Sequence, residues 1–202
     1  MSYKKVSFLQ INEDMDPKIN GITTDKDLSQ LLRGCSRCYK ITNNTKFVMS
    51  HTNLVNLTLP KRFTKWVIII NTTGLPKSKK HENNPTETVL LPKLGHWVCC
   101  VIFNKTLYIL DGLCKISQNT DVMLNIKTFC RSNNLTMEDV NLRFQVLNST
   151  WCGYLACYFV AKASLLSQHS FLKVINLLRQ HNVKSREKHM LQYVLRHFKK
   201  QN

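Results

Sequence analysis

Cys152 is the residue of the chain best placed to act as a nucleophile. It begins an apolar run, residues 152–166, that is typical of a buried helix. A thiol in the first turn of a helix lies at the positive end of the helix dipole and near free backbone N–H groups, which favour the thiolate. Backbone amides around Cys152 and Gly153 could face an oxyanion, and Gln145 could add a side-chain donor. These residues predict nucleophilic catalysis.

His96 and Asp111 could activate that thiol. Residues 96–103 and 107–111 are rich in β-branched and aromatic side chains and flank a short turn, which predicts a hairpin. Pairing across the turn places His96 and Asp111 at the same end of the hairpin. An imidazole can hold the thiol proton, and a carboxylate on its other nitrogen fixes the ring. Taken singly, each residue also fits an ordinary role: a packing cysteine, a capping histidine and a turn-forming aspartate.

The other segments must position these side chains, and they show helical and strand patterns with little Gly or Pro between them. In chain order they predict a helix from Thr24-Asp25 that stops at Gly34, a buried strand over 63–71, a long surface loop over 75–94, a helix over 121–131, a short turn over 137–140, a strand over 141–147 that carries Gln145, and two amphipathic helices over 170–202. We expect one α+β domain spanning residues 1–202, in which a small mixed sheet packs on the central helix that begins at Cys152.

The composition is that of a folded, basic protein. The 202 residues are 43% apolar, enough for one core, and 29 Lys and Arg stand against 12 Asp and Glu. The net charge of +17 predicts attraction to a polyanion, nucleic acid before an acidic protein or membrane surface. The sequence shows no apolar run near the roughly 20 residues of a membrane span and no secretory signal. We expect an intracellular monomer that is not secreted and binds no membrane.

The basic excess is concentrated in residues 170–202, which hold eight Lys or Arg and one acidic residue. Basic side chains on an amphipathic helix can simply be solvated, but this face is too one-sided for a surface of mixed charges. We predict sequence-independent, salt-dependent DNA binding, because no DNA-reading motif accompanies the charge. The predicted contact residues are Lys173, Arg179, Lys184, Arg186, Lys188, Arg196, Lys199 and Lys200.

Cys35 and Cys38 form a CxxC pair, a spacing that can chelate a metal ion from a turn. The sequence offers no second CxxC and no suitably spaced pair of histidines, so packing is favoured over zinc and we predict no metal site. The eight cysteines fit a reducing compartment better than a set of disulfides.

The order of these residues resembles the adenovirus-type maturation proteases, the adenain family. The shared features are His96-Trp97, an acidic residue that closes the second strand, Gln145 seven residues before the cysteine, and Cys152-Gly153 opening an apolar helix. Residues 69–74, Ile-Ile-Asn-Thr-Thr-Gly, are similar to the adenoviral segment that leads towards the catalytic histidine. The resemblance covers residues 24–166, and the family shares a clan with the SUMO-specific and poxvirus core proteases.

The resemblance implies a papain-like α+β cysteine peptidase of the adenain/SUMO-protease type, which cleaves capsid and core precursor proteins during virion maturation. It implies location in the virion and host nucleus, no chemically required cofactor, double-stranded DNA as an activator and a viral peptide as a second candidate activator. The roles it implies are nucleophile for Cys152, general base and then acid for His96, orienting carboxylate for Asp111, oxyanion donor for Gln145, close approach of substrate at Gly153 and support of the site by Trp97.

The chain also departs from the family. Asp111 stands where mammalian adenoviral enzymes have Glu, the turn of the hairpin is shorter, and fewer residues follow the cysteine. Cys130 is the nearest candidate for the cysteine that bonds the adenoviral peptide. Two alternatives stay open: an isopeptidase that acts on ubiquitin-like or SUMO-like conjugates, and a basic DNA-binding virion protein without catalysis.

Overall fold

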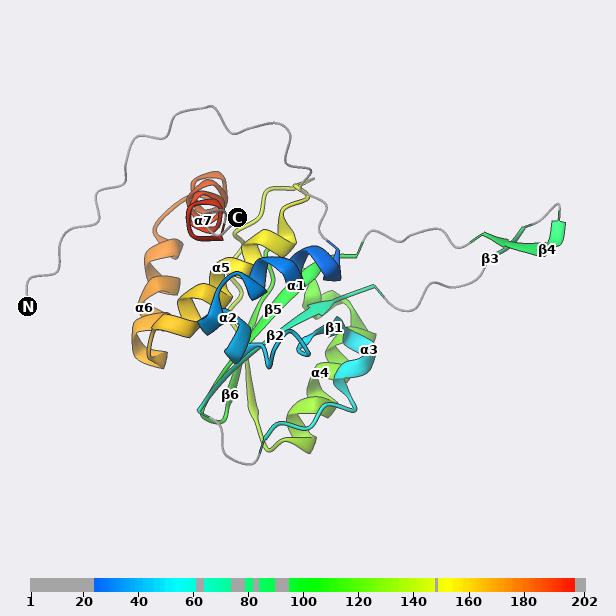
Figure 1. The fold of residues 1–202 in the computed structure, drawn as a ribbon, viewed down its shortest axis with the longest axis horizontal. Helices are drawn as coiled ribbons and strands as arrows, with labels where there is room; N and C mark the ends of the chain where they lie inside the picture. Colours follow the sequence, from blue (N-terminus) through cyan, green and yellow to red (C-terminus); the bar gives the residue numbers. More distant parts are fainter. Residues whose placement is uncertain are drawn as a thin grey trace, which may run out of the picture.

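A five-stranded mixed sheet forms the centre of the fold (Figure 1), in a computed structural model that describes residues 24–60, 64–73, 79–81, 84–89, 95–147 and 149–198. The strand order is β1-β2-β5-β6-β7; β1 and β7 run parallel to their neighbours, and the inner pairs are antiparallel. The strands are β1 Val48–Ser50, β2 Lys65–Asn71, β5 Trp97–Phe103, β6 Thr106–Leu110 and β7 Thr136–Asp139. Every residue of β5 is buried, as in a strand covered on both faces.

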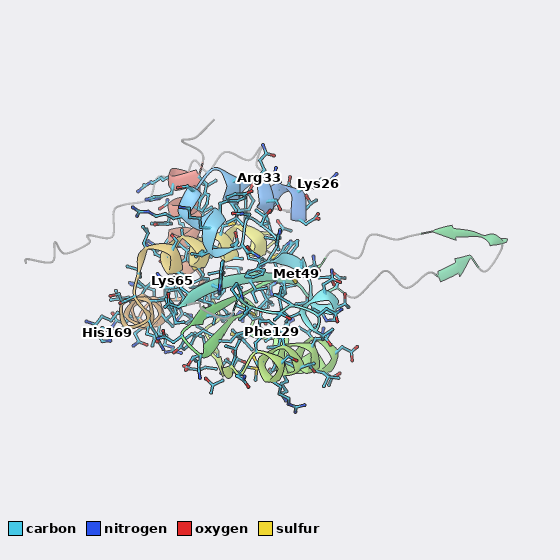
Figure 2. The ribbon with its side chains drawn as sticks, turned by 60° about the horizontal axis from the view of Figure 1, so that its bottom comes forward. Lys26, Arg33, Met49, Lys65, Phe129 and His169 are labelled. Carbon is cyan, nitrogen blue, oxygen red and sulfur yellow. The ribbon has the colours of Figure 1, made fainter. Side chains whose placement is uncertain are left out.

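Helices cover both faces of the sheet. Side chains alternate along β2, so that Val67 and Ile69 join one core cluster while Ile68 and Ile70 join the other. Phe129, which Figure 2 labels, belongs to the second cluster and comes from the helix α4, Thr120–Ser132. The first cluster is covered by α1 Asp25–Arg33, α2 Ser36–Ile41, α5 Cys152–Leu165, α6 Gln168–Arg179 and α7 Val183–Phe198, and the second by α3 His51–Leu54 and α4 Thr120–Ser132.

The helix α5 is buried on nearly every side. It packs against β5, α2 and α7, and Leu155, Phe159 and Val160 are fully buried. A helix without a solvated face is stabilised by its tertiary contacts, so α5 has one position relative to the sheet. Within the described ranges, no helix is long and apolar enough to cross a membrane.

Most of the predicted elements are confirmed. The first helix begins at Thr24, whose side chain forms a capping box with Asp27, and it ends at Gly34. The buried strand, the hairpin, the helix at Cys152 and the two C-terminal helices also lie where the sequence predicts them. The predicted α+β class is therefore confirmed at the level of its layers.

The prediction was wrong around residues 136–147. A strand, β7, replaces the predicted turn and pairs with β6. Three of its four residues are exposed and polar, so its sequence lacks the apolar pattern that predicts a strand. The predicted strand over 141–147 is absent from those residues, all of which are described. The N–H groups of Phe144 and Gln145 both donate to the carbonyl of Gly112, at 3.1 and 3.0 Å, instead of forming a ladder. Burial of alternate residues without a neighbouring strand produced the misleading pattern.

The predicted loop over 75–94 contains two short strands. β3 Lys79–His81 and β4 Asn84–Val89 pair in antiparallel fashion with a register shift after Lys80. Threonine and valine in β4 favour extended backbone, and a two-stranded ribbon tolerates its proline because both strands are edges. The remaining residues of that segment lie outside the described part of the chain.

Candidate active site

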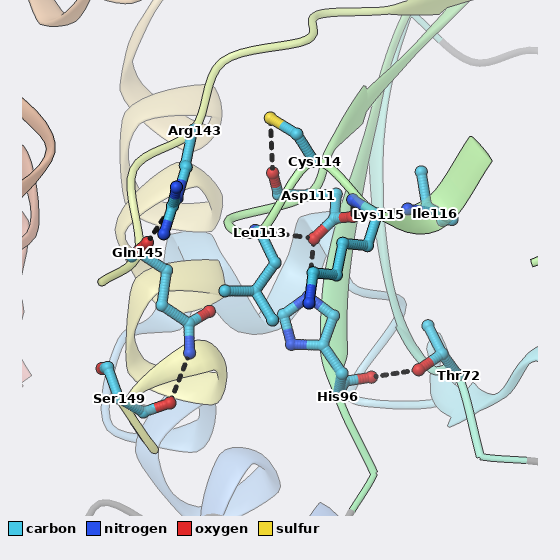
Figure 3. A network of polar contacts seen from close by, with 10 residues as sticks. All are labelled: Thr72, His96, Asp111, Leu113, Cys114, Lys115, Ile116, Arg143, Gln145 and Ser149. Carbon is cyan, nitrogen blue, oxygen red and sulfur yellow. Dashed lines mark hydrogen bonds and ion pairs between the residues drawn. The ribbon is translucent and has the colours of Figure 1, made fainter. Parts of the chain in front are cut away.

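The hairpin of β5 and β6 brings His96 and Asp111 together. His96 directly precedes β5 and Asp111 directly follows β6, so both lie at the same end of the hairpin. His96 Nε2 lies 2.6 Å from Asp111 Oδ1, and the two side chains are 20% and 2% exposed. The predicted proximity of the two residues is confirmed, and Figure 3 shows the ring beside the carboxylate.

The carboxylate of Asp111 is held by backbone amides as well as by His96. It accepts hydrogen bonds from the N–H groups of Leu113 at 2.9 Å, Lys115 at 2.6 Å and Ile116 at 2.7 Å (Figure 3). Burial raises the pKa of Asp111, but the bonds from His96 and the amides favour the ionised form and hold that pKa below 3.8. The turn after β6 thus fixes an ionised carboxylate beside the imidazole.

A tight contact with β2 fixes the backbone of His96. The carbonyl of His96 accepts hydrogen bonds from the backbone N–H of Thr72 at 2.9 Å and from its hydroxyl at 3.1 Å. Gly95 lies so close to Asn71 and Thr73 that a Cβ atom there would collide with both side chains. The residues after β2 therefore position the histidine.

Cys152 lies in the first turn of α5, where its thiol interacts with the imidazole of His96 and helps to raise the pKa of that ring. Its thiol is partly exposed, whereas those of Cys99, Cys100 and Cys157 are buried. Because Nε2 of His96 bonds to Asp111, the nitrogen that remains for the thiol is Nδ1. Burial lowers the pKa of His96, but the contacts with Asp111 and Cys152 outweigh it and raise that pKa from 6.5 to about 9. The imidazole therefore keeps its proton at neutral pH.

Gln145 lies beside this triad with its amide orientation fixed. Its Nε2 donates to the carbonyl of Ser149 at 2.7 Å (Figure 3). If the amide group were rotated by 180°, its oxygen would face the carbonyl oxygen of Ser149, and two acceptors would meet without a proton between them. One N–H of the same nitrogen remains for another acceptor. The Oε1 atom is buried and has no hydrogen-bond partner, an arrangement that costs about 1 to 3 kcal/mol in folded proteins.

Gly112 forms the support on which Gln145 rests. A Cβ atom at Gly112 would lie 2.9 Å from Cβ and Oε1 of Gln145 and 2.9 Å from Phe144 Cε2. The absence of a side chain therefore lets the segment carrying Gln145 approach the residue after Asp111.

Gly153 and Trp97, the other two predicted site residues, lie in the same region. Gly153 is buried in the first turn of α5, directly after Cys152. Trp97 is 5% exposed, begins β5 and belongs to the core cluster that includes α5. Both positions are compatible with support of the site.

The predicted DNA-contact residues fall into two groups. Lys173, Arg179, Lys184 and Arg196 are exposed, and Lys188 is partly exposed. Arg186 instead donates to three backbone carbonyls, those of Leu178, Arg143 and Arg179. Arg179 also donates to the carbonyl of Val140. Lys199 and Lys200 lie outside the described residues.

The CxxC pair is part of the packing around α5. The Sγ atom of the fully buried Cys38 lies 4.0 Å from Ser164 Oγ, and burial together with the hydrogen bond of its thiol to Cys35 raises the pKa of Cys38. Within the described residues, no cluster of three potential ligands could hold a metal ion. Cys130 is buried in α4, in the second core cluster.

Sequence patterns miss several residues that position the site. Gly112 follows Asp111 as any turn glycine could, and its only signal is the glycine itself. Leu113, Lys115 and Ser149 contribute backbone atoms, which a side-chain pattern cannot disclose.

The groups assembled at this end of the sheet are those that acyl transfer requires. A partly exposed thiol in a helix first turn contacts an imidazole, which a buried carboxylate orients, and a fixed amide lies nearby. No protein-family model matches the chain, and no curated protein matches it at a significant level.

Proposed function

We propose that this protein is a cysteine endopeptidase of the adenovirus-type maturation protease kind. One observation carries the proposal: His96 Nε2 lies 2.6 Å from Asp111 Oδ1, on a hairpin whose strand β5 packs against α5, the helix that begins at Cys152. The raised pKa of His96, to which Cys152 contributes, agrees with this arrangement. A structural cysteine needs neither an oriented imidazole nor partial exposure, and Cys152 has both.

Peptide cleavage would proceed through a thioester. The thiolate of Cys152 attacks the carbonyl carbon of the scissile peptide, and the charge moves to its oxygen. The free N–H of Gln145 and a backbone N–H of the α5 first turn would stabilise this oxyanion. His96 then gives its proton to the leaving amine as the C–N bond breaks. Water, deprotonated by the same imidazole, attacks the thioester and releases the carboxylate product and the thiolate.

The papain-like type is the finer part of the proposal. Its support is the layer arrangement, in which a helix with the nucleophile at its N-terminus packs against the strand that follows the histidine. The substrates would be viral capsid and core precursors cleaved after a small residue, often glycine, as the resemblance implies.

The basic helices support a DNA-stimulated form of this activity. The exposed lysines and arginines of α6 and α7 could neutralise phosphates without reading bases. The enzyme would then act as a monomer in the virion and the host nucleus, on precursors located on the same DNA.

The test is a search for new peptide termini. The protein is mixed with a proteome-derived peptide library, with and without double-stranded DNA at low salt, and the products are identified by mass spectrometry. The control is Cys152→Ala, which removes the nucleophile and changes little volume. Cleavage that disappears in the control supports the peptidase, and stimulation by DNA supports the role of the charge.

Two results would contradict the proposal. Cleavage of a diglycine-terminated ubiquitin-like reporter without cleavage of the library would favour an isopeptidase. Silence towards both, together with salt-sensitive DNA binding by wild type and Cys152→Ala alike, would favour a DNA-binding protein without catalysis.

A further inference from the structure

A buried carboxylate of α7 contacts the segment that carries Gln145. Glu187 is 8% exposed, and its Oε1 accepts a hydrogen bond of 3.3 Å from the backbone N–H of Val146. Acidic side chains are seldom buried unless they are paired. Here the partner is the residue immediately after Gln145.

The neighbouring arginine joins the same segment to α6. Nε of Arg186 donates to the carbonyl of Leu178 at 2.6 Å, and one terminal nitrogen donates to the carbonyl of Arg179 at 3.1 Å. These carbonyls belong to the last two residues of α6, and that of Leu178 also accepts the backbone N–H of His181 at 3.1 Å. The other terminal nitrogen donates to the carbonyl of Arg143, two residues before Gln145. One guanidinium thus links two helices and the segment.

The segment depends on such contacts because it is not part of the sheet. Arg179 donates to the carbonyl of Val140 at 2.7 Å, and Arg143 Nε lies 3.4 Å from the carbonyl of Gln145. A strand would be held by a regular ladder from its neighbours, but residues 141–147 form no strand. Side chains therefore supply part of the hydrogen bonding that fixes the backbone on either side of Gln145.

We propose that Arg186 and Glu187 are positioning residues for catalysis, which hold the amide of Gln145 where it stabilises the oxyanion. The inference rests on the proposed peptidase function. It differs from the role as a DNA contact that the sequence predicts for Arg186, because the donors of that side chain are directed to backbone carbonyls of its own chain.

The test compares two substitutions at Glu187. Glu187→Ala removes the acceptor for the N–H of Val146, whereas Glu187→Gln keeps an oxygen there. We expect Glu187→Ala to lower kcat about tenfold with little change in KM, since small displacements of a catalytic group cost rate more than binding. Glu187→Gln should restore most of the loss. The matched control is Ser185→Ala, at an exposed position in the same turn of α7.

Two further measurements separate positioning from general support of the fold. In a Gln145→Ala background, Glu187→Ala should lower kcat by less than about twofold, because the amide it positions is gone. Arg186→Lys and Glu187→Ala should each speed amide hydrogen exchange in residues 142–147 and leave β5 protected as in the wild type. Arg186→Lys should also lower kcat, since an ammonium cannot reach three carbonyls at once.

The possible failures are distinguishable. Three results would overturn the positioning role while leaving the peptidase in place. Glu187→Ala could lower kcat as much in the Gln145→Ala background as in the wild type, or Glu187→Gln could lower kcat as much as Glu187→Ala. Amide hydrogen exchange in residues 142–147 could also stay unchanged. A wild-type protein that cleaves nothing would overturn the proposed function and with it any catalytic role for these residues. The exchange experiment would then decide only whether the contacts hold the segment.

Discussion

Gly112 and Gln145 meet through both backbone and side chain. The carbonyl of Gly112 accepts the N–H of Gln145 at 3.0 Å, and the space where a Cβ would stand at Gly112 is bounded by Cβ and Oε1 of Gln145. Gly112 directly follows Asp111. The residue that carries the carboxylate and the residue that supports Gln145, the candidate oxyanion donor, are therefore adjacent in the chain.

Gly112→Ala should therefore impair catalysis more than stability. The added methyl would lie 2.9 Å from Gln145 and Phe144, so the segment carrying the amide must shift. We expect kcat to fall by about ten- to a hundredfold, as for displacement of an oxyanion donor. The control is Gly34→Ala at the end of α1, where φ is −63° and alanine fits. Equal activity of the two variants would contradict this role of Gly112.

Asp111→Asn should lower the pKa of His96. The carboxylate opposes the effect of burial and, with Cys152, raises that pKa to about 9, so its neutralisation leaves burial less opposed. The value can be followed by NMR titration of the His96 ring in a Cys152→Ala background, with and without Asp111→Asn. Peptidase activity near neutral pH should fall as well. A pKa that does not move would show that Asp111 is not the group that stabilises the imidazolium.

Stability should fall at alkaline pH as His96 loses its proton. Its pKa is about 9 in the folded protein and 6.5 in the unfolded reference. The stabilisation is complete below pH 6.5, declines above it and is lost as the pH rises through 9, with a size on the order of 3 kcal/mol. Urea unfolding between pH 6 and 10 measures it. The same series on His96→Ala should lack this component, and parallel curves for both proteins would refute the assignment.

Cys152 should be alkylated before the other described thiols of the sheet and its helices. It is partly exposed and contacts His96, whereas burial raises the pKa of Cys130 to about 11 and that of Cys157 to about 12. Limited treatment with iodoacetamide at neutral pH, followed by peptide mass spectrometry, gives the order of labelling. His96→Ala should slow the labelling of Cys152. Prior labelling of Cys157 would argue against an activated Cys152.

Neutralising two exposed lysines should weaken DNA binding. Lys173→Gln with Lys184→Gln removes charges from α6 and α7, so the slope of log K against log salt should decrease in magnitude by up to about 2. The control is Lys127→Gln, an exposed lysine on α4 across the sheet. An effect of the control equal to half that of the α6–α7 pair, and so equal per charge removed, would mean that DNA responds to net charge alone.

The sequence predicts elements whose signals are local. Thr24 and Gly34 mark the ends of α1 because helix caps involve neighbouring residues, and the apolar run after Cys152 marks α5 because burial on all sides leaves no polar face. The proximity of His96 and Asp111 follows from hairpin pairing alone.

The errors concern features determined by distant contacts. β7 is polar and exposed, and only its pairing with β6 makes it a strand. Gln145 is supported by Gly112, which lies 33 positions earlier in the chain. Its neighbour Val146 is supported by Glu187, which lies 41 positions later. This support comes from backbone atoms and from the carboxylate of Glu187, which stands in an otherwise basic helix. The pattern of residue types along the chain therefore does not predict it.

The order of the elements along the chain has a consequence for timing during synthesis. His96, Asp111 and Cys152 all precede α7, yet α7 supplies the contacts of Arg186 and Glu187 with residues 143 and 146. A nascent chain in which Cys152 has left the ribosome but α7 has not would lack this support. For the proposed peptidase, cleavage by a chain still on the ribosome should thus be suppressed until α7 has folded onto α5. Synthesis of the protein and the onset of the proposed activity would then be separated in time.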